Sequence, residues 1–125
     1  MRMDTNGVAD AVLNYLLTKH PRVYRNIAEQ SPVFPYVVFK IDTITNTYPS
    51  FDMYLVVNIY DEPGASVRTI EALGDSIDFG LEQKVINGTD MSLRFGLEQR
   101  QYVSSEDLID AQLVNFRYVI RGYFS

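Results

Sequence analysis

The sequence predicts an α+β domain in which two amphipathic helices pack on one face of a mainly antiparallel β-sheet. Two helical stripes and several runs of alternating apolar and polar residues support this fold class. Each run has one mostly apolar face and one mixed face, as in antiparallel sheets covered on one side, whereas a doubly covered parallel sheet gives unbroken apolar runs. The predicted order of elements is α-β-β-β-α-β-β, within a single domain that spans residues 1–125.

The first helix is predicted over residues 4–20. Val8, Val12 and Leu16 recur at a spacing of four residues and form an apolar stripe. Pro21 ends the helix, because the residue before a proline is pushed out of helical geometry.

Three strands are expected after this helix. The first covers Val23–Ile27, and the next two cover residues 36–45 and 51–60. The turn-rich segment between the last two predicts that they form an antiparallel pair. In the third strand the apolar face holds Phe51, Met53, Leu55, Val57 and Ile59, and the mixed face holds Asp52, Tyr54, Asn58 and Tyr60.

The second helix is predicted from a cap at Ser66 to about Lys84, with apolar residues at helical spacing. A turn at Asn87–Gly88 then leads into strands over residues 91–98 and 113–124. The core is predicted to include one set of residues from both helices and three strands: Val12, Leu16, Ile70, Leu73, Ile77, Val57, Phe95 and Phe116.

Composition excludes several classes of protein. The chain has 125 residues, is 46% apolar and carries a net charge of −5, so a basic nucleic-acid-coating protein is disfavoured. It has no cysteine, which removes disulfide frameworks, thiolate metal sites and cysteine nucleophiles. No apolar run is long enough for a membrane span or a signal peptide, so we expect an intracellular domain without a membrane partner.

Candidate catalytic groups are few. His20 is the single histidine, and at the end of a helix it complements the helix dipole more readily than it builds a metal centre or a triad. The triplet Glu82-Gln83-Lys84 spells a nuclease motif but falls at a helix end, where charged residues are usually solvated. The acids at positions 106, 107 and 110 lack the spacing of a calcium loop, and no phosphate-binding loop occurs. We therefore predict no enzyme activity, cofactor or metal.

The mixed faces of the strands are the remaining candidate surface. Tyrosines and arginines are enriched at protein–protein contacts, although the same residues also suit an ordinary polar sheet face, and alternation alone does not choose. We predict a subunit interface in which arginines of one subunit face acids of the next, made of Tyr54, Tyr60, Asp61, Glu62, Arg94, Glu98, Glu106, Arg117 and Arg121.

Two segments carry a resemblance to a known family. The runs Ser31-Pro32-Val33-Phe34-Pro35-Tyr36-Val37-Val38-Phe39 and Leu55-Val56-Val57-Asn58-Ile59-Tyr60-Asp61, with the arginines at positions 117 and 121, resemble the tail terminator proteins of long-tailed bacteriophages and prophages. These proteins are also called tail completion or tail-to-head joining proteins. The family has no catalytic residues to transfer to this chain.

The resemblance implies a structural role in the virion. It predicts a hexameric ring of this chain that sits on the tail tube, ends tail polymerisation and joins the tail to the head. The implied partners are the major tail tube protein and the head connector or head-completion protein, with DNA only passing through the channel. The implied location is the head–tail junction, after assembly in the host cytoplasm. Alternatives are another phage neck or head-completion adaptor, a small ligand-binding α+β domain and a nuclease-like enzyme.

Overall fold

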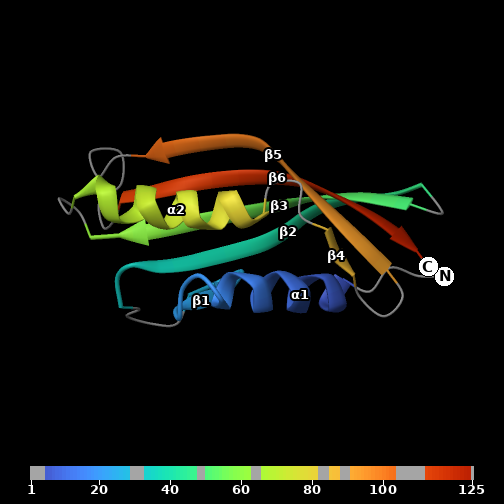
Figure 1. Ribbon diagram of the computed structural model, residues 1–125, viewed down its shortest axis with the longest axis horizontal. Coiled ribbons are helices and arrows are strands. Elements are labelled where there is room, and N and C mark those ends of the chain that lie inside the picture. The colour runs from blue at the N-terminus through green and yellow to red at the C-terminus, as the bar shows by residue number, and fades with distance from the viewer. Residues whose placement is uncertain are drawn as a thin grey trace.

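Two helices and six strands follow one another in the computed structural model, which describes residues 5–28, 33–47, 50–62, 66–81, 85–87, 91–103 and 112–124 (Figure 1). In chain order the elements are α1 (Thr5–Leu17), β1 (Val23–Arg25), β2 (Tyr36–Thr47), β3 (Ser50–Asp61), α2 (Val67–Leu81), β4 (Val85–Asn87), β5 (Met91–Val103) and β6 (Gln112–Phe124). The α+β class is therefore confirmed.

The strands form one curled, mixed sheet in the order β1-β2-β3-β6-β5-β4. Four of the five pairings are antiparallel, including the predicted pairing of β2 with β3, but β1 runs parallel to β2. The predicted order of elements lacked β4, which adds a strand between α2 and β5. β1 was predicted as a strand, but a strand of three residues contains too little alternation to reveal its direction, and for the same reason β4 was missed.

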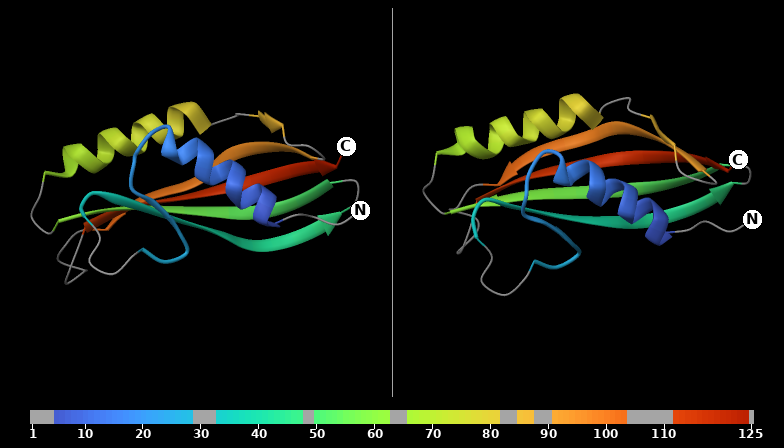
Figure 2. Two further views of the ribbon diagram at one scale, coloured as in Figure 1. Left: turned by 90° about the horizontal axis from the view of Figure 1, so that it is seen from below. Right: turned by 60° about the horizontal axis from the view of Figure 1, so that its bottom comes forward.

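Both helices cover the same face of the sheet, and no helix of the described residues lies on the opposite face (Figure 2). The core between the layers takes Val12 and Leu16 from α1 and Ile70 and Ile77 from α2, all at most 1% exposed. The helices also meet each other, because the Tyr15 hydroxyl donates a hydrogen bond to the Ile77 carbonyl at 2.7 Å. The prediction of two helices on one face is confirmed for the described part of the chain.

The helix ends differ slightly from the predicted bounds. α1 stops at Leu17, and the amides of Lys19 and His20 both donate to the Leu16 carbonyl as the chain leaves the helix. At the start of α2 the Ser66 hydroxyl accepts a hydrogen bond from the Arg68 amide at 3.3 Å, which confirms the predicted cap. The last three residues of the predicted second helix, 82–84, lie outside the described residues.

Seven of the eight predicted core residues are fully buried, and Leu73 is the exception. It lies on the flank of α2 and is only partly buried against the core. Alternation in the strands was a reliable guide, since the burial pattern of β3 changes at every residue from Phe51 to Asp61.

A β-bulge changes the direction of side chains in β5. The register shifts between Leu97 and Gln99, so that Arg100 pairs with the buried Phe116 of β6. Arg100 therefore lies on the helix side of the sheet, although strict alternation from Arg94 would have placed it on the opposite side. β2 has a second register shift, between Asp42 and Ile44.

Candidate functional site

The side of the sheet opposite the two helices, called the open face below, is not covered by a helix of the described residues (Figure 2). Its side chains alternate with those of the core and are half-buried or exposed. Across β2, β3, β6 and β5 the open face includes Lys40, Asp52, Tyr54, Val56, Asn58, Tyr60, Arg94, Gly96, Glu98, Arg117, Val119 and Arg121.

One row of charged residues crosses the open face near the end of β6. Arg121 pairs with Asp52 of β3 through two hydrogen bonds, Nε to Oδ1 at 2.8 Å and Nη2 to Oδ2 at 3.2 Å. This bidentate contact raises the pKa of the Arg121 guanidinium, first by hydrogen bonding to Asp52 and then by its charge. Arg94 lies directly across from Arg121 in the ladder. The exposed Arg94 has no hydrogen-bond or ion-pair partner among the described residues.

A second row centres on Arg117. Its guanidinium carbon lies 4.0 Å from the centroid of the Tyr54 ring, in a cation–π contact. Its Nε lies 3.3 Å from Glu98 Oε1, an ion pair without hydrogen-bond geometry. Next to this row, the Asn115 side-chain amide donates to Asn58 Oδ1 at 2.5 Å. Several side chains of the open face therefore contact one another within the chain, whereas Arg94 has no such contact among the described residues.

Aromatic rings gather at the other end of the open face. The rings of Tyr36 and Tyr60 stack with centroids 5.1 Å apart, and Phe34 lies 5.4 Å from Tyr36. Tyr24 of β1 meets Tyr36 edge to face at 6.2 Å. Burial raises the pKa of Tyr36, and the neighbouring Tyr60 and Tyr24 raise it further. These four rings form an aromatic cluster of the type enriched at protein contacts.

The segment that leads into β2 is held by the chain that follows α1. The Phe34–Pro35 peptide bond is cis. The Pro35 carbonyl accepts a hydrogen bond from Arg22 Nε at 3.0 Å and lies 2.8 Å from His20 Nε2. His20 therefore contacts a backbone carbonyl, beyond the helix-end role predicted for it.

The helix side of the sheet carries a charged cluster that the sequence did not identify. Arg100 donates to Glu71 Oε2 at 2.6 Å and to Asp75 Oδ1 at 2.7 Å, and its guanidinium lies over the Phe116 ring at 5.0 Å. Burial acts to lower the pKa of Arg100, but the hydrogen bond to Asp75 and the charge of Glu71 outweigh it and raise the pKa. The only available signal was the spacing of the two acids by four residues on α2.

The predicted interface residues fall into three groups. Six of them share the open face: Tyr54, Tyr60, Arg94, Glu98, Arg117 and Arg121. Asp61 was wrongly predicted to face a neighbouring subunit, because odd-numbered residues of β3 face the core. Asp61 is 5% exposed, and its Oδ1 accepts the Glu62 amide at 2.8 Å. Glu62 is exposed, and Glu106 lies outside the described residues.

The predicted pairing of arginines with acids of another subunit stays a prediction, but two of these arginines also have acidic partners within the chain. Arg121 and Arg117 have acidic partners within the chain, in Asp52 and Glu98. Asp52 lies directly across the ladder from Arg121, and Glu98 lies at the bulge of β5 next to Arg117. Both pairings therefore follow from the strand register. This leaves Arg94 as the arginine of the open face whose charge is uncompensated within the described residues.

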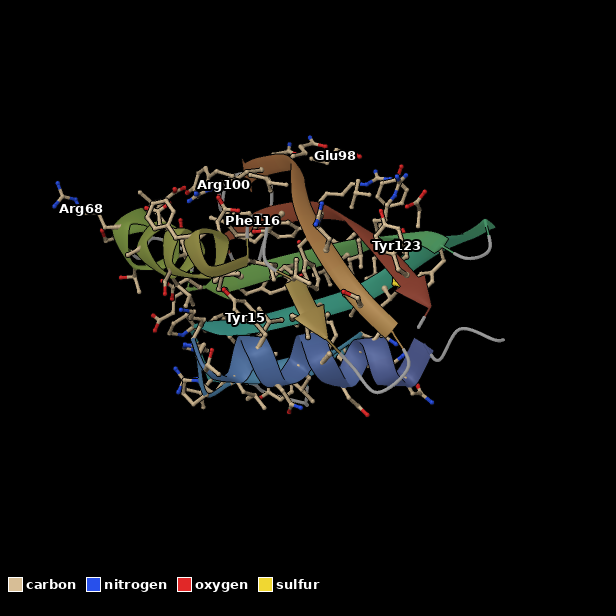
Figure 3. All side chains as sticks on the ribbon, turned by 45° about the vertical axis from the view of Figure 1, so that its right-hand side comes forward. Tyr15, Arg68, Glu98, Arg100, Phe116 and Tyr123 are labelled. Carbon is tan, nitrogen blue, oxygen red and sulfur yellow. The ribbon has the colours of Figure 1, made fainter. Side chains whose placement is uncertain are left out.

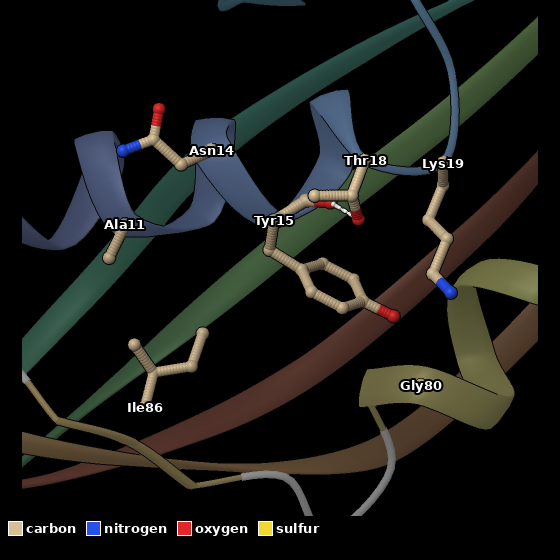
Figure 4. A pocket seen from close by; sticks show the side chains of 7 residues that line it. All are labelled: Ala11, Asn14, Tyr15, Thr18, Lys19, Gly80 and Ile86. Atoms are coloured by element: carbon tan, nitrogen blue, oxygen red, sulfur yellow. Dashed lines mark hydrogen bonds between the residues drawn. The ribbon is translucent and has the colours of Figure 1, made fainter.

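A hollow of about 450 Å³ lies between α1, the end of α2 and β4 (Figure 4). It is open to solvent and lined by Ala11, Asn14, Tyr15, Thr18, Lys19, Gly80 and Ile86. Its titratable groups are the amine of Lys19 and the hydroxyl of Tyr15, which is already bonded to the Ile77 carbonyl. Burial and the charge of Asp78 raise the pKa of Tyr15 to about 12, so this hydroxyl keeps its proton at neutral pH.

The described part of the chain has neither a metal centre nor a membrane-spanning helix. Within it, no three acids or histidines are grouped in a way that could hold a metal ion. Neither α1 nor α2 has the length and apolar character needed to cross a bilayer. No protein-family model matches the sequence, and no curated protein matches it significantly. The triplet at residues 82–84, whose nuclease reading the sequence disfavoured, and the acids at 107 and 110 lie outside the described residues.

Proposed function

We propose that this chain is a structural subunit of a long-tailed bacteriophage or prophage virion, forming a ring that caps the tail tube. In this role it ends tail polymerisation and provides the surface to which the head connector or head-completion protein binds. The observation that carries the proposal is the open face, where an aromatic cluster and rows of ordered arginines occupy one side of a sheet whose other side is covered by helices.

The chemistry of the open face favours contact with protein. Tyrosine and arginine contribute large contact areas and forked hydrogen bonds, and both are enriched in interfaces. On this face the Tyr54 ring and the Arg117 guanidinium are already stacked, so little side-chain entropy is lost when a partner covers them. The four rings of the aromatic cluster add apolar area at one end of the same surface.

The sequence resemblance gives the open face its proposed partners. Ring subunits of the tail terminator family contact their own copies, the major tail tube protein and the head side of the junction. The net charge of −5 agrees with a channel through which DNA passes without adhering, because like charges repel.

Co-expression with the major tail tube protein of the same genome tests the proposal. We expect tubes of limited length with a ring at one end by negative-stain electron microscopy, and tubes without a length limit when this chain is omitted. Unlimited tubes with no ring in the presence of the wild-type chain would contradict the proposed function.

Charge reversal tests the role of the open face in capping. The double variant Arg117→Glu/Arg121→Glu should abolish capping and leave the circular dichroism spectrum unchanged. The first variant places a second carboxylate next to Asp52 and could lose capping through unfolding alone. A second variant, Asp52→Arg/Arg121→Glu, therefore keeps an ion pair at this position with its charges exchanged. Lys40→Glu, a single charge reversal on β2 outside both arginine rows, is the control for charge reversal on this face and should cap normally. Normal tube lengths with both Arg121 variants would show that this row lies outside the interface.

A further inference from the structure

Arg94 and Arg121 form a like-charged pair directly across the β5–β6 ladder. Such pairs destabilise a sheet unless an anion lies between or beside them. Asp52 binds Arg121 through both of its carboxylate oxygens. Arg94 is exposed and lacks a partner among the described residues. Among the described residues, the end of the open face near β4 therefore presents one guanidinium without a compensating charge, beside another that is paired with Asp52.

An acidic surface lies on the flank of α2, called the α2 acidic flank below. Glu71, Asp75 and Asp78 follow one another at helical spacing. Arg100 forms ion pairs with Glu71 and Asp75, and Asp78 Oδ1 accepts a hydrogen bond from the Tyr118 hydroxyl at 2.8 Å. The side chains of Glu71 and Asp75 remain 40% and 49% exposed. Three carboxylates against one guanidinium leave two negative charges, while Arg68 extends away from the row at the start of the helix (Figure 3).

We infer that the Arg94–Arg121 pair of one copy binds the α2 acidic flank of a second copy. This inference rests on the proposed ring and names the contact that closes it. The two surfaces are on opposite sides of the sheet, and they also lie at opposite ends of it. Arg100 marks the acidic end and Tyr123, next to Arg121 on β6, marks the basic end (Figure 3). Two different patches on opposite sides of one subunit give a head-to-tail contact, the type that builds rings.

Charge decides between a second copy and a nucleic acid as the occupant. The open face as a whole is close to neutral. Its basic residues are Lys40, Arg94, Arg117 and Arg121, and its acidic residues are Asp42, Asp52 and Glu98. A phosphate backbone needs an extended basic surface, and this chain carries −5 overall. A cluster of carboxylates on a helix of another protein chain therefore suits this single uncompensated guanidinium better than a nucleic acid does.

Cross-linking of engineered cysteines tests this contact directly, because the chain contains no cysteine of its own. Gly96→Cys places a thiol on the open face two residues from Arg94, where a Cβ would meet no atom within 4 Å. Ala72→Cys places one on the exposed side of α2, next to Glu71. The two variants, one carrying a tag that shifts its mobility, are mixed with a short bismaleimide both free in solution and on tail tubes. We expect more of the mixed dimer than of either homodimer. As a control, Asn14→Cys on α1 takes the place of Ala72→Cys in the mixture, and this chain should not cross-link to Gly96→Cys.

Charge and salt dependence identify the residues responsible. Adding Arg94→Glu to the Gly96→Cys chain should reduce the mixed dimer about tenfold or more, because like charges then meet across the contact. Lys40→Glu should leave the yield unchanged. Salt at about 1 M, where the Debye length is about 3 Å, should also reduce it.

Three outcomes would overturn the inference. In the first, the mixed dimer of Gly96→Cys and Ala72→Cys forms no more than the control dimer with Asn14→Cys. In the second, homodimers of Gly96→Cys predominate. In the third, Gly96→Cys cross-links to the tube protein alone. If the wild-type chain caps tubes while the mixed dimer is absent on them, this contact is wrong and the proposed function stands. If the mixed dimer forms but tubes are never capped, the contact stands and the proposed function is wrong.

Discussion

Two glycines on neighbouring strands should respond in opposite ways to the same substitution. Gly122 of β6 lies directly across from Phe51 of β3, and the buried Phe51 ring covers it. A Cβ at position 122 would overlap three carbons of that ring. Gly96 of β5 is on the open face, where a Cβ would meet no atom within 4 Å. A ring that covers a glycine in this manner is a recognised device in β-sheets.

The magnitude follows from what the Phe51 ring must do. To reach the normal carbon–carbon separation of about 3.5–4.0 Å, the ring would have to retreat into a core that is fully buried around it. Overpacking of this kind costs about 1–3 kcal/mol, so Gly122→Ala should lower the free energy of unfolding by that amount. Gly96→Ala should raise it by about 0.4–1 kcal/mol, because alanine restricts the unfolded chain.

Thermal and urea denaturation followed by circular dichroism measure the difference. The two alanine variants should differ by about 1.5–4 kcal/mol, or roughly 6–16 °C in Tm at about 4 °C per kcal/mol. Adding Phe51→Leu to Gly122→Ala should show a coupling of at least about 0.5 kcal/mol, since the smaller side chain relieves the overlap. Equal stability of the two alanine variants would refute the close packing of Phe51 on Gly122.

Two further predictions concern α2 and its contact with α1. Ile77→Ala should cost about 2–5 kcal/mol because the side chain is fully buried, whereas Leu73→Ala should cost less because Leu73 is partly exposed, and urea denaturation measures both. For Tyr15, whose pKa rises from 10.0 to about 12 on folding, the stabilisation is fully present below pH 10 and is lost as the pH rises towards 12. Wild-type stability should therefore fall more steeply than that of Tyr15→Phe between pH 10 and 12, and parallel curves would contradict burial of this hydroxyl.

The sequence predicted the long elements well because their side-chain periodicity reflects burial. The alternation from Phe51 to Ile59 matches the buried positions of β3, and the stripe through Ile70 and Ile77 matches the buried side of α2. It could not predict β1's direction or the existence of β4, since three residues carry no usable period. Partner choice in short edge strands depends on tertiary contacts that no local pattern records.

The candidate surface was predicted in part for the same reason. Tyr54, Arg117 and Arg121 were correctly placed on one face, because no register shift interrupts the pairing of β3 with β6. Arg100 escaped prediction because the predicted strand ended at residue 98, and because one extra residue in β5 reverses the side to which later side chains point. Asp61 was misassigned because the predicted strand ended at residue 60, whereas β3 continues to Asp61 and places this odd position on the core side.

The positions of the two register shifts have a mechanical consequence. β3 and β6 form an unbroken ladder from Ser50 opposite Tyr123 to Asp61 opposite Gln112. The strands on either side of this ladder each contain one shift, after Asp42 in β2 and after Leu97 in β5. A bulge bends its strand and increases local twist, so curvature is concentrated in the flanks while the middle stays straight. We therefore expect the β3–β6 ladder to bend less than the strands on either side of it.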